Sequence, residues 1–285
     1  MPQIQNTALE RLKSGQLSLG IGLRQARSVD IGKIMKTCGY DWLFIDMEHG
    51  SMSVDSAAQI SIAASDAGIT PIVRVPGFQH FHATRVLDAG AQGVVFPHVD
   101  TADTARELAR YCRYPPVGQR SVVGAIPQVN FQSLPMAEMT QSVNESTLVA
   151  VMIESPKAVD NVDEIAKVDG IDVVLVGTND LCMEMGIPGE IDNPLIIDAM
   201  KKIIAACNAC GKYPGLGGVY TPDLQEEYIS MGMRFILSTQ DLAIMMQGAT
   251  ERATFLRNLS IHNSEAVPLK GNHHASSSPD MSGCP

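Results

Sequence analysis

The sequence predicts an α/β fold, a single (β/α)8 barrel of the TIM type. Short apolar segments alternate with longer helical patterns from residue 17 to residue 258. There are about eight units of each kind over roughly 250 residues, which is the count and the length of such a barrel. The chain has 285 residues, of which 45% are hydrophobic, so it is long enough to bury one large core.

The expected strands are almost continuous runs of apolar residues. Such runs are typical of parallel strands that are buried on both faces of a sheet. They occupy residues 17–23, 42–46, 71–75, 93–97, 148–153, 172–176, 214–219 and 234–238.

The expected helices lie between these strands, and several follow a Ser, Thr, Asp or Asn residue that can cap the first turn. Most end near a glycine, where the chain can turn back into the next strand. They occupy residues 28–38, 53–67, 79–89, 101–112, 157–168, 194–210, 222–231 and 241–257. A further helix is expected before the first strand.

A doubly wound open sheet is the alternative fold. It is disfavoured because no GxGxxG turn follows the first expected strand and because the chain shows no division into two halves. Residues 1–259 are therefore expected to form one domain. Residues 113–146, rich in Pro, Gln and Ser, make a long connection of the kind that covers a site or contacts another subunit. The polar, Gly/Ser/Pro-rich residues 260–285 predict a disordered tail.

The composition favours an enzyme that acts on a small molecule in the cytoplasm. A net charge of -10 disfavours binding to nucleic acid or to an anionic membrane. No apolar stretch approaches the roughly 18 residues of a membrane span, and the N-terminus lacks the apolar core of a signal peptide. The six cysteines show no disulfide framework. Cys207 and Cys210 fall inside an expected helix without a second ligand pair, which disfavours a zinc or redox site.

The polar residues of greatest interest follow the strands, because the active site of a barrel lies at the carboxyl ends of its strands. The second strand runs into two carboxyl residues and a histidine, the third strand carries an arginine, and the fifth and sixth are followed by polar residues that include a carboxyl group. These residues are Asp46, Glu48, His49, Arg74, Glu154, Thr178, Asn179 and Asp180.

Glu154 and Asp180 are the candidate metal ligands. They close neighbouring strands, which lie about 4.8 Å apart, so their carboxylates can converge over the barrel mouth. Two converging anions repel each other unless a proton or a cation joins them. A hard divalent ion such as Mg²⁺ or Mn²⁺ suits this pair. The alternative is that each carboxylate caps a helix and faces solvent.

Arg74 and His49 are the candidate catalytic groups. A charged side chain in an apolar strand is costly unless it meets an anion, and a guanidinium suits a carboxylate or an enolate. The alternative for Arg74 is an internal salt bridge with Asp46 or Glu48. A histidine beside carboxylates can move protons near pH 7. The alternative for His49 is a structural role.

Other histidines and the lysines carry weaker expectations. His80, His82 and His98 are near enough to strand ends to reach the mouth. No lysine falls within an expected strand, which disfavours Schiff-base chemistry. Lys157, three residues after Glu154, is the nearest candidate, but its place at a helix start favours solvent.

These residues, in this order, resemble the HpcH/HpaI aldolase family, the metal-dependent class II pyruvate aldolases related to 2-dehydro-3-deoxyglucarate aldolase. The resemblance runs from about residue 8 to residue 258. It rests on DWLFIDMEHG (41–50), IVRVPG (72–77), GVVFPHVDTADTA (93–105), YPPVGQRSVVG (114–124), VMIES (151–155), VGTNDLCMEMG (176–186) and PGLGGV (214–219).

The resemblance implies a barrel of the phosphoenolpyruvate/pyruvate type that often exchanges its last helix with a neighbour and assembles as a hexamer. Glu154 and Asp180 would hold a divalent metal, with Mg²⁺ expected and Mn²⁺ or Co²⁺ as alternatives. Arg74 would hold the 2-oxo acid and stabilise the enolate oxygen. His49 would be the acid/base, acting through water on the metal, with Asp46 orienting it. The backbone at Thr178, Asn179 and Asp180 would receive the substrate carboxylate.

The activity that the resemblance implies is cleavage of a 4-hydroxy-2-oxo acid to pyruvate and an aldehyde. Three departures from the family pattern concern the acceptor side: Met152 where many members carry Gln, Gly-Thr-Asn-Asp where many carry Gly-Pro-Ala-Asp, and Ser121 where glycine is common. Similar motifs occur in macrophomate synthase, so decarboxylation of oxaloacetate is the alternative activity. A catalytically silent ligand-binding barrel is the alternative from another class.

Overall fold

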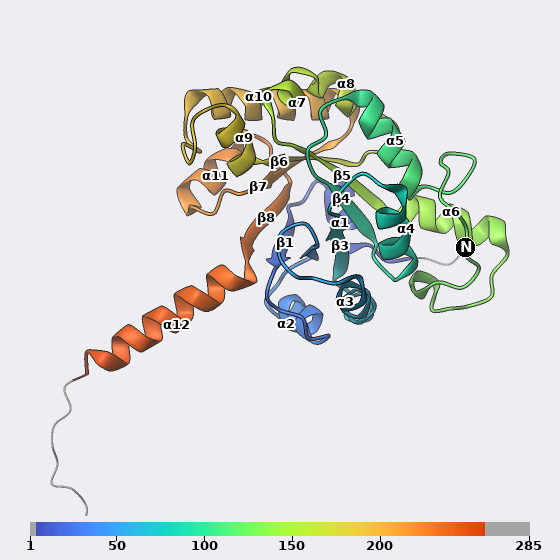
Figure 1. Ribbon diagram of the computed structural model, residues 1–285, viewed down its shortest axis with the longest axis horizontal. Coiled ribbons are helices and arrows are strands. Elements are labelled where there is room, and N and C mark those ends of the chain that lie inside the picture. The colour runs from blue at the N-terminus through green and yellow to red at the C-terminus, as the bar shows by residue number, and fades with distance from the viewer. Residues whose placement is uncertain (1–3, 260–285) are drawn as a thin grey trace, which may run out of the picture. The chain divides into compact units, whose positions relative to one another are not determined.

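The computed structural model describes residues 4–259 and contains a closed barrel of eight parallel strands in sequence order (Figure 1). The (β/α)8 prediction is confirmed, and the doubly wound alternative is wrong because β1 pairs with both β2 and β8. All eight expected strands are present within two residues of their predicted ends. They are β1 (Ser18–Leu23), β2 (Trp42–Asp46), β3 (Thr70–Arg74), β4 (Gly93–Phe96), β5 (Leu148–Ile153), β6 (Val173–Gly177), β7 (Tyr213–Gly217) and β8 (Phe235–Gln240).

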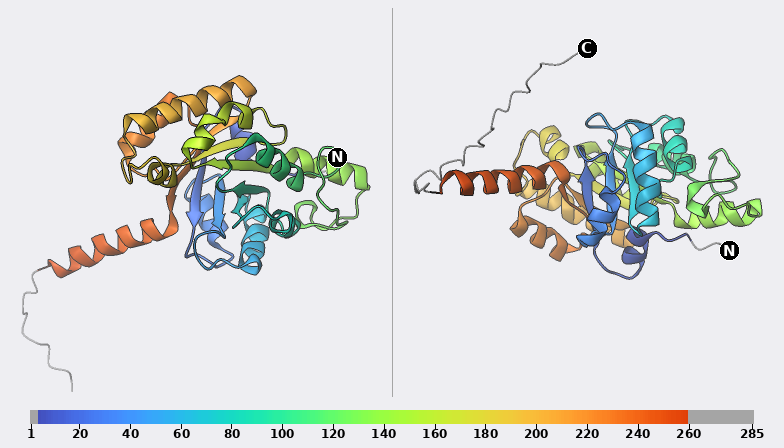
Figure 2. Two further views of the ribbon diagram at one scale, coloured as in Figure 1. Left: turned by 45° about the horizontal axis from the view of Figure 1, so that its top comes forward. Right: turned by 90° about the horizontal axis from the view of Figure 1, so that it is seen from below.

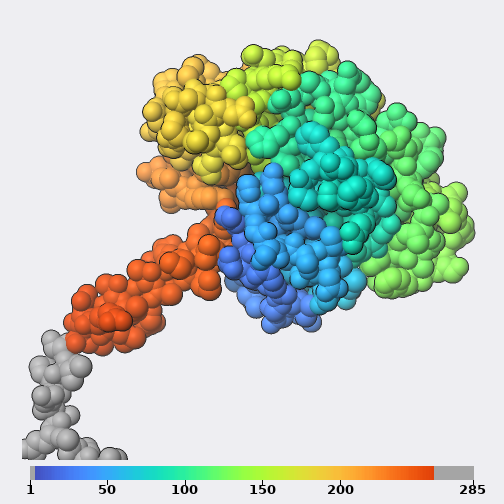
Figure 3. All heavy atoms as spheres, viewed as in Figure 1, coloured from blue at the N-terminus to red at the C-terminus, as the bar shows by residue number. Residues whose placement is uncertain are grey.

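Helices that follow the strands surround the barrel (Figure 2). The exception is α12, none of whose residues is buried. In Figure 3 the blue to green part of the chain forms a continuous surface on the face shown, as expected for helices packed closely over strands. The helices are α1 (Thr7–Lys13), α2 (Ile31–Thr37), α3 (Val54–Asp66), α4 (His80–Asp88), α5 (Ala102–Cys112), η1 (Pro127–Val129), α6 (Met136–Ser146), α7 (Pro156–Asp160), α8 (Val162–Ala166), α9 (Thr178–Glu184), α10 (Pro194–Cys210), α11 (Pro222–Met231) and α12 (Asp241–Arg257).

The described residues up to Met246 form one compact unit, and those from Gln247 onward belong to a second. The predicted tail, 260–285, lies outside the described residues. No helix between residues 4 and 259 is long and apolar enough to cross a membrane.

Side chains inside the barrel fill the part near the amino ends of the strands. Trp42 stacks on Phe235 with ring centroids 4.0 Å apart, and a Cβ at Gly20 would overlap the Trp42 ring, so only glycine fits there. Helix α1 closes the amino end of the barrel, because Ala8 and Leu12 pack into the same cluster. The interior is therefore a packed core below an open carboxyl end.

Strand residues alternate between this inner core and the outer layer under the helices, as the two-residue period of a strand requires. On β2, Trp42 and Phe44 face inward while Leu43 and Ile45 join the outer core. The inward-facing positions continue to the carboxyl ends of the strands. Side chains at those ends therefore lie above the packed core.

Three helical segments differ from the predictions. The expected helix 157–168 is broken into α7 and α8 at Asn161, whose side chain donates to the Asp100 carbonyl at 2.8 Å. The long connection 113–146 contains α6, whose sequence is too polar to show a clear apolar face; Met139 and Val143 nevertheless pack beside Tyr114. Helix α9 begins directly at the end of β6 and leaves no loop for a sequence pattern to mark.

Candidate active site

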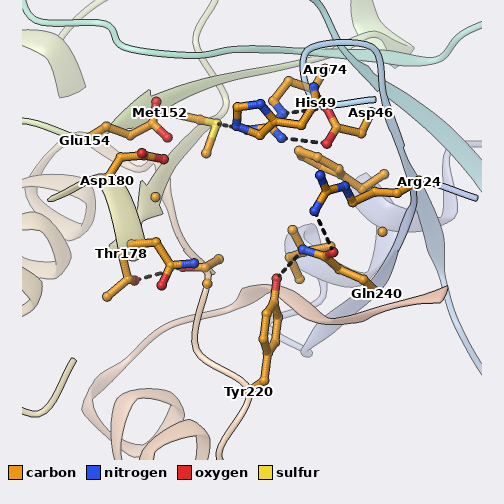
Figure 4. Close-up of a pocket in the computed structure, with 17 residues that line it drawn as sticks. Arg24, Asp46, His49, Arg74, Met152, Glu154, Thr178, Asp180, Tyr220 and Gln240 are labelled. Carbon is orange, nitrogen blue, oxygen red and sulfur yellow. Dashed lines mark hydrogen bonds and ion pairs between the residues drawn. The ribbon is translucent and has the colours of Figure 1, made fainter. Parts of the chain in front are cut away.

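A pocket of about 250 Å³ opens at the carboxyl ends of the strands (Figure 4). Every strand except β4 contributes to its lining, and its polar side chains continue the inward-facing positions of their strands. Asp46 lies two residues after Phe44, Arg74 two after Ile72, and Glu154 two after Met152. The alternation of the strands therefore brings together charged groups that are far apart in the sequence.

Arg74 is held between two carboxylates. Its Nε and Nη2 atoms donate to Asp46 at 3.0 and 2.7 Å, and its Nη1 atom lies 2.8 Å from Oε2 of Glu48. Burial alone would lower the pKa of Arg74, but the hydrogen bond and charge of Asp46 and the charge of Glu48 raise it. The internal salt bridge considered from the sequence is thus present with both partners, and Arg74 also lines the pocket.

His49 lies at the edge of the pocket with 54% of its side chain exposed. The Oδ1 atom of Asp46 accepts the backbone N–H groups of Glu48 and His49 at 3.1 and 3.2 Å. Asp46 therefore positions His49 through the main chain, whereas the carboxylate beside the imidazole is that of Glu48, with Oε2 4.0 Å from Nε2. The ring is accessible to a ligand in the pocket.

Glu154 is almost completely buried, at 1% exposed. Its Oε2 atom accepts the backbone N–H of His98 at 2.7 Å, and a Cβ at Gly177 would overlap its Oε1 atom. Burial raises the pKa of Glu154 to about 7, and the charge of Asp180 acts in the same direction, while the hydrogen bond from His98 opposes them. The ionised form of Glu154 therefore gains much from a cation.

The donor set of this corner fits a divalent cation. Glu154 and Asp180 lie side by side at the pocket wall (Figure 4), and the charge of Arg74 is already shared by two other carboxylates. Carboxylate oxygens are the ligands that Mg²⁺ and Mn²⁺ prefer. Between residues 4 and 259, no group of three or more His, Cys, Asp or Glu side chains is placed to hold a metal ion. Two protein ligands, completed by water or substrate oxygens, are typical of Mg²⁺ sites.

Neither candidate ligand is a helix cap. Ser155, not Glu154, caps α7, with its hydroxyl accepting from the N–H of Ala158 at 2.9 Å. Gly177 occupies the cap position of α9, and Asp180 lies inside its first turn while lining the pocket. The capping alternative is wrong for both carboxylates.

The backbone at the start of α9 faces the same pocket. The hydroxyl of Thr178 donates to the Gly217 carbonyl at 2.8 Å, which ties β6 to β7. The first N–H groups of a helix have no carbonyl partner within it. Gly218, with a φ of 85°, leaves space there, because a Cβ would lie 3.3 Å from the nitrogen of Asn179. These N–H groups are suited to a carboxylate.

Of the remaining residues considered from the sequence, His98 contacts the site and the others do not line the pocket. His98 supports Glu154 through its backbone and lies with Nδ1 3.7 Å from the same carboxylate oxygen. His80 and His82 lie on α4, where their rings are near Phe81, and neither lines this pocket. Lys157 lies 3.7 Å from Asp100 and is 64% exposed, as its helix-start position predicts.

Three polar pocket residues were missed from the sequence: Arg24, Tyr220 and Gln240. A signal for Arg24 was present, because it follows Gly20 and Gly22 at the two-residue period of the inward-facing positions on β1. Gln240 is the last residue of β8, whose pairing with β1 is irregular, and Tyr220 lies in the loop after β7. At both positions the two-residue period is lost.

Known proteins resemble this chain over most of its length. A model of the HpcH/HpaI aldolase/citrate lyase family matches residues 25–246. A 4-hydroxy-4-methyl-2-oxoglutarate aldolase of Hapsidospora irregularis is 35% identical over 269 residues, covering 92% of this chain and 98% of the relative. The crystal structure of an HpcH/HpaI aldolase from Desulfitobacterium hafniense superposes with a TM-score of 0.85 at 28% identity, covering 90% of this chain and 98% of that one. Macrophomate synthase superposes with a TM-score of 0.74 at 27% identity, covering 90% and 92% of the two chains.

Proposed function

The chain belongs to the HpcH/HpaI aldolase/citrate lyase family, and we propose that it is a divalent-metal-dependent aldolase that cleaves 4-hydroxy-2-oxo acids to pyruvate and an aldehyde or ketone. The observation that carries the proposal is the pairing of two carboxylates, one of them buried, with a fixed arginine and an accessible histidine in one pocket. Among the described residues, no lysine lines this pocket, which favours a metal-dependent over an imine-forming aldolase.

Each group in the pocket has a role in binding or catalysis that agrees with its contacts. The N–H groups of Thr178, Asn179 and Asp180 bind the carboxylate of the 2-oxo acid. Arg74, immobilised by Asp46 and Glu48, presents its charge to the 2-oxo oxygen, where negative charge develops. Asp46 holds both Arg74 and the main chain of His49 and thereby fixes their relative position.

In the cleavage step the C4 hydroxyl gives its proton to His49 and the C3–C4 bond breaks. The electron pair of that bond passes to the pyruvate enolate, and C3 then takes the proton back from His49, directly or through water, which gives pyruvate. Glu154 and Asp180 would hold a divalent cation, which would supply additional positive charge for this electron pair. We assign Mg²⁺ as that cation, with Mn²⁺ and Co²⁺ as functional substitutes.

Decarboxylation of oxaloacetate is the second candidate activity, and the structural similarity to macrophomate synthase favours it. The same electron sink serves both reactions, but CO₂ leaves without giving up a proton. His49 therefore distinguishes them, because only aldol cleavage needs a base.

The test is release of pyruvate by the purified protein from a panel of 4-hydroxy-2-oxo acids and from oxaloacetate, each with and without Mg²⁺. We expect metal-dependent release from at least one 4-hydroxy-2-oxo acid. Release of pyruvate from oxaloacetate alone would favour the decarboxylase over the aldolase activity. Release from none of the substrates would reject both activities.

A further inference from the structure

We propose that Arg24, Gln240 and Tyr220 form a subsite for a second carboxylate, carried on the part of the substrate that leaves as the carbonyl product. This inference rests on the proposed aldolase function and names its substrate class, a 4-hydroxy-2-oxo acid with an acid group beyond C4. We call these three residues the distal subsite.

The barrel topology places Arg24, the charged member of the distal subsite, across the pocket from Glu154. Arg24 follows β1 and Glu154 follows β5, and strands four places apart in a closed eight-stranded barrel are diametrically opposed. Figure 4 shows Arg24 and Gln240 on the side of the opening opposite Glu154 and Asp180. A substrate whose 2-oxo acid end lies at Glu154 therefore extends its other end toward Arg24.

Arg24 brings a positive charge that the protein itself leaves unpaired. Among residues 4–259, no carboxylate lies within ion-pair distance of its guanidinium, whereas Arg74 in the same pocket contacts two. The side-chain contact recorded for Arg24 is a long one, 3.4 Å from Nη1 to Oε1 of Gln240. A half-buried guanidinium in this state has donors available for an anionic ligand.

The backbone of Arg24 is firmly positioned. The carboxylate of Asp241 accepts the N–H groups of Arg24, Gln25 and Ala26 at distances from 2.6 to 3.2 Å, and also that of Leu242 at 2.7 Å. Asp241 is thus occupied by the main chain and fixes the loop after β1 to the end of β8.

Gln240 and Tyr220 complete the arrangement. The Nε2 atom of Gln240 donates to the hydroxyl oxygen of Tyr220 at 3.1 Å, so the O–H of Tyr220 remains available as a donor. Gly22 leaves room for this side chain, since a Cβ there would lie 3.2 Å from Cγ of Gln240. The pairing of β1 with β8 shifts register just before this point, a type of irregularity that redirects side chains at strand ends.

The chemistry favours a carboxylate over a neutral group. The described side chains around the pocket carry four carboxylates, Asp46, Glu48, Glu154 and Asp180, which would repel an acid group that had no cation of its own. Planar guanidinium donors match the two oxygens of a carboxylate. An alkyl group at the same place would leave Arg24 without a partner when the substrate excludes water.

Two pairs of compounds test the distal subsite, each differing by one carboxylate in place of a methyl group. The first pair is cleaved: 4-hydroxy-2-oxoglutarate gives pyruvate and glyoxylate, and 4-hydroxy-2-oxopentanoate gives pyruvate and acetaldehyde. The second pair, 2-oxoglutarate and 2-oxopentanoate, lacks the C4 hydroxyl and reports binding alone, measured by calorimetry with Mg²⁺ present.

For Arg24→Gln we expect the ratio of kcat/KM for the charged over the neutral substrate to fall about 10- to 100-fold, the range for loss of a hydrogen bond to a charged group. The ratio of the two binding constants should fall similarly, and Arg24→Lys should recover part of both. The matched control is Arg27→Gln, which removes the same charge from the same loop. Arg27 is exposed, contacts Ser51 at 2.7 Å and does not line the pocket.

The outcomes separate this inference from the proposed function. Unchanged ratios in Arg24→Gln, or equal changes in Arg27→Gln, overturn the distal subsite while leaving the aldolase intact. A wild-type preference for the neutral compounds, or for a 2-oxo-3-deoxy sugar acid that has no second carboxylate, also overturns it. Absence of pyruvate from both substrates counts against the aldolase, and the binding pair then still decides the distal subsite.

Discussion

At the scale of single residues, the pocket is organised by how its charges are shared. Arg74 has two carboxylate partners, and the buried carboxylate of Glu154 has a backbone N–H and a neighbouring anion. The charge of Arg74 is balanced by its carboxylate partners, whereas the negative charges of Glu154 and Asp180 would be stabilised by a cation. This difference yields predictions for metal binding, catalysis and stability.

The first prediction is that the activity depends on a divalent metal bound by Glu154 and Asp180. Treatment with EDTA should abolish pyruvate release, and Mg²⁺, Mn²⁺ or Co²⁺ should restore it. Binding of Mn²⁺, followed by electron paramagnetic resonance, should be lost in Glu154→Gln and in Asp180→Asn. It should be retained in Asp198→Asn, which changes an exposed carboxylate of α10. Full activity after rigorous chelation, or trapping of an imine by borohydride, would contradict the prediction.

The second prediction separates the two activities at His49. His49→Ala should slow aldol cleavage by about 10²- to 10⁴-fold, the usual range for a lost general acid/base, and should slow oxaloacetate decarboxylation much less. Arg74→Ala should impair both. Equal losses in both reactions for His49→Ala would show that this side chain mainly holds the site together.

The third prediction concerns stability. Arg74→Ala leaves Asp46 without its main partner in a buried place, so we expect a loss of about 3–5 kcal/mol in the free energy of unfolding, measured in urea. The matched control is Arg106→Ala, which removes an arginine from the exposed pair with Asp103; its free energy of unfolding should hardly change. A small effect for Arg74→Ala would mean that water reaches the pair readily.

At the scale of elements, the end of β6 matters because Gly177 is where the strand meets both α9 and the carboxylate of Glu154. A Cβ at this position would overlap that carboxylate, whereas a Cβ at Gly124 meets nothing within 4 Å. The strand end is therefore shaped for Glu154 by the absence of a side chain.

The fourth prediction follows from this contact. Gly177→Ala should displace Glu154 and weaken Mn²⁺ binding by at least tenfold, while Gly124→Ala should leave it unchanged. The fold should survive both changes, which circular dichroism would check. Normal metal affinity in Gly177→Ala would show that Glu154 does not need its present position to bind the ion.

At the scale of the whole molecule, apolar side chains remain on the surface of two segments. Val122, Val123 and Phe131 of the long connection are exposed, as are Ile244, Met245 and Met246 of α12. Ile126 of the same connection is buried beside Tyr114 and does not belong to this exposed set. Exposed apolar patches usually mark a partner surface.

The fifth prediction is a symmetric homo-oligomer, a hexamer in which these two segments lie at subunit boundaries. Light scattering at micromolar concentration should give a mass several times the 30.6 kDa of the chain. Val122→Glu combined with Val123→Glu should shift the distribution toward smaller species, whereas Val29→Glu, at another exposed position, should not. A monomer mass for the wild-type protein would refute the prediction.

The sequence by itself determined the eight strands and the order of the charged residues at their ends. Parallel strands that are buried on both faces show as local apolar runs, and the strand ends of a barrel share one face, so Asp46, Arg74 and Glu154 could be assigned to that face from local pattern alone. Helix α6 was missed because it depends on packing against distant segments, and α7 was wrongly joined to α8 because the break depends on a single Asn161 hydrogen bond. Helix α9 was missed because no loop separates it from β6.

Only the tertiary structure decided how those charges combine. It showed that Arg74 binds Asp46 and Glu48 together. It also showed that the buried carboxylate of Glu154 accepts the N–H of His98 and lies beside Asp180 (Figure 4). It also brought Arg24 beside Gln240, which is 216 residues away in the chain. The physical reason is barrel closure: pairing of β8 with β1 joins the two ends of the sheet, and its irregular register sets which side chains meet across that seam.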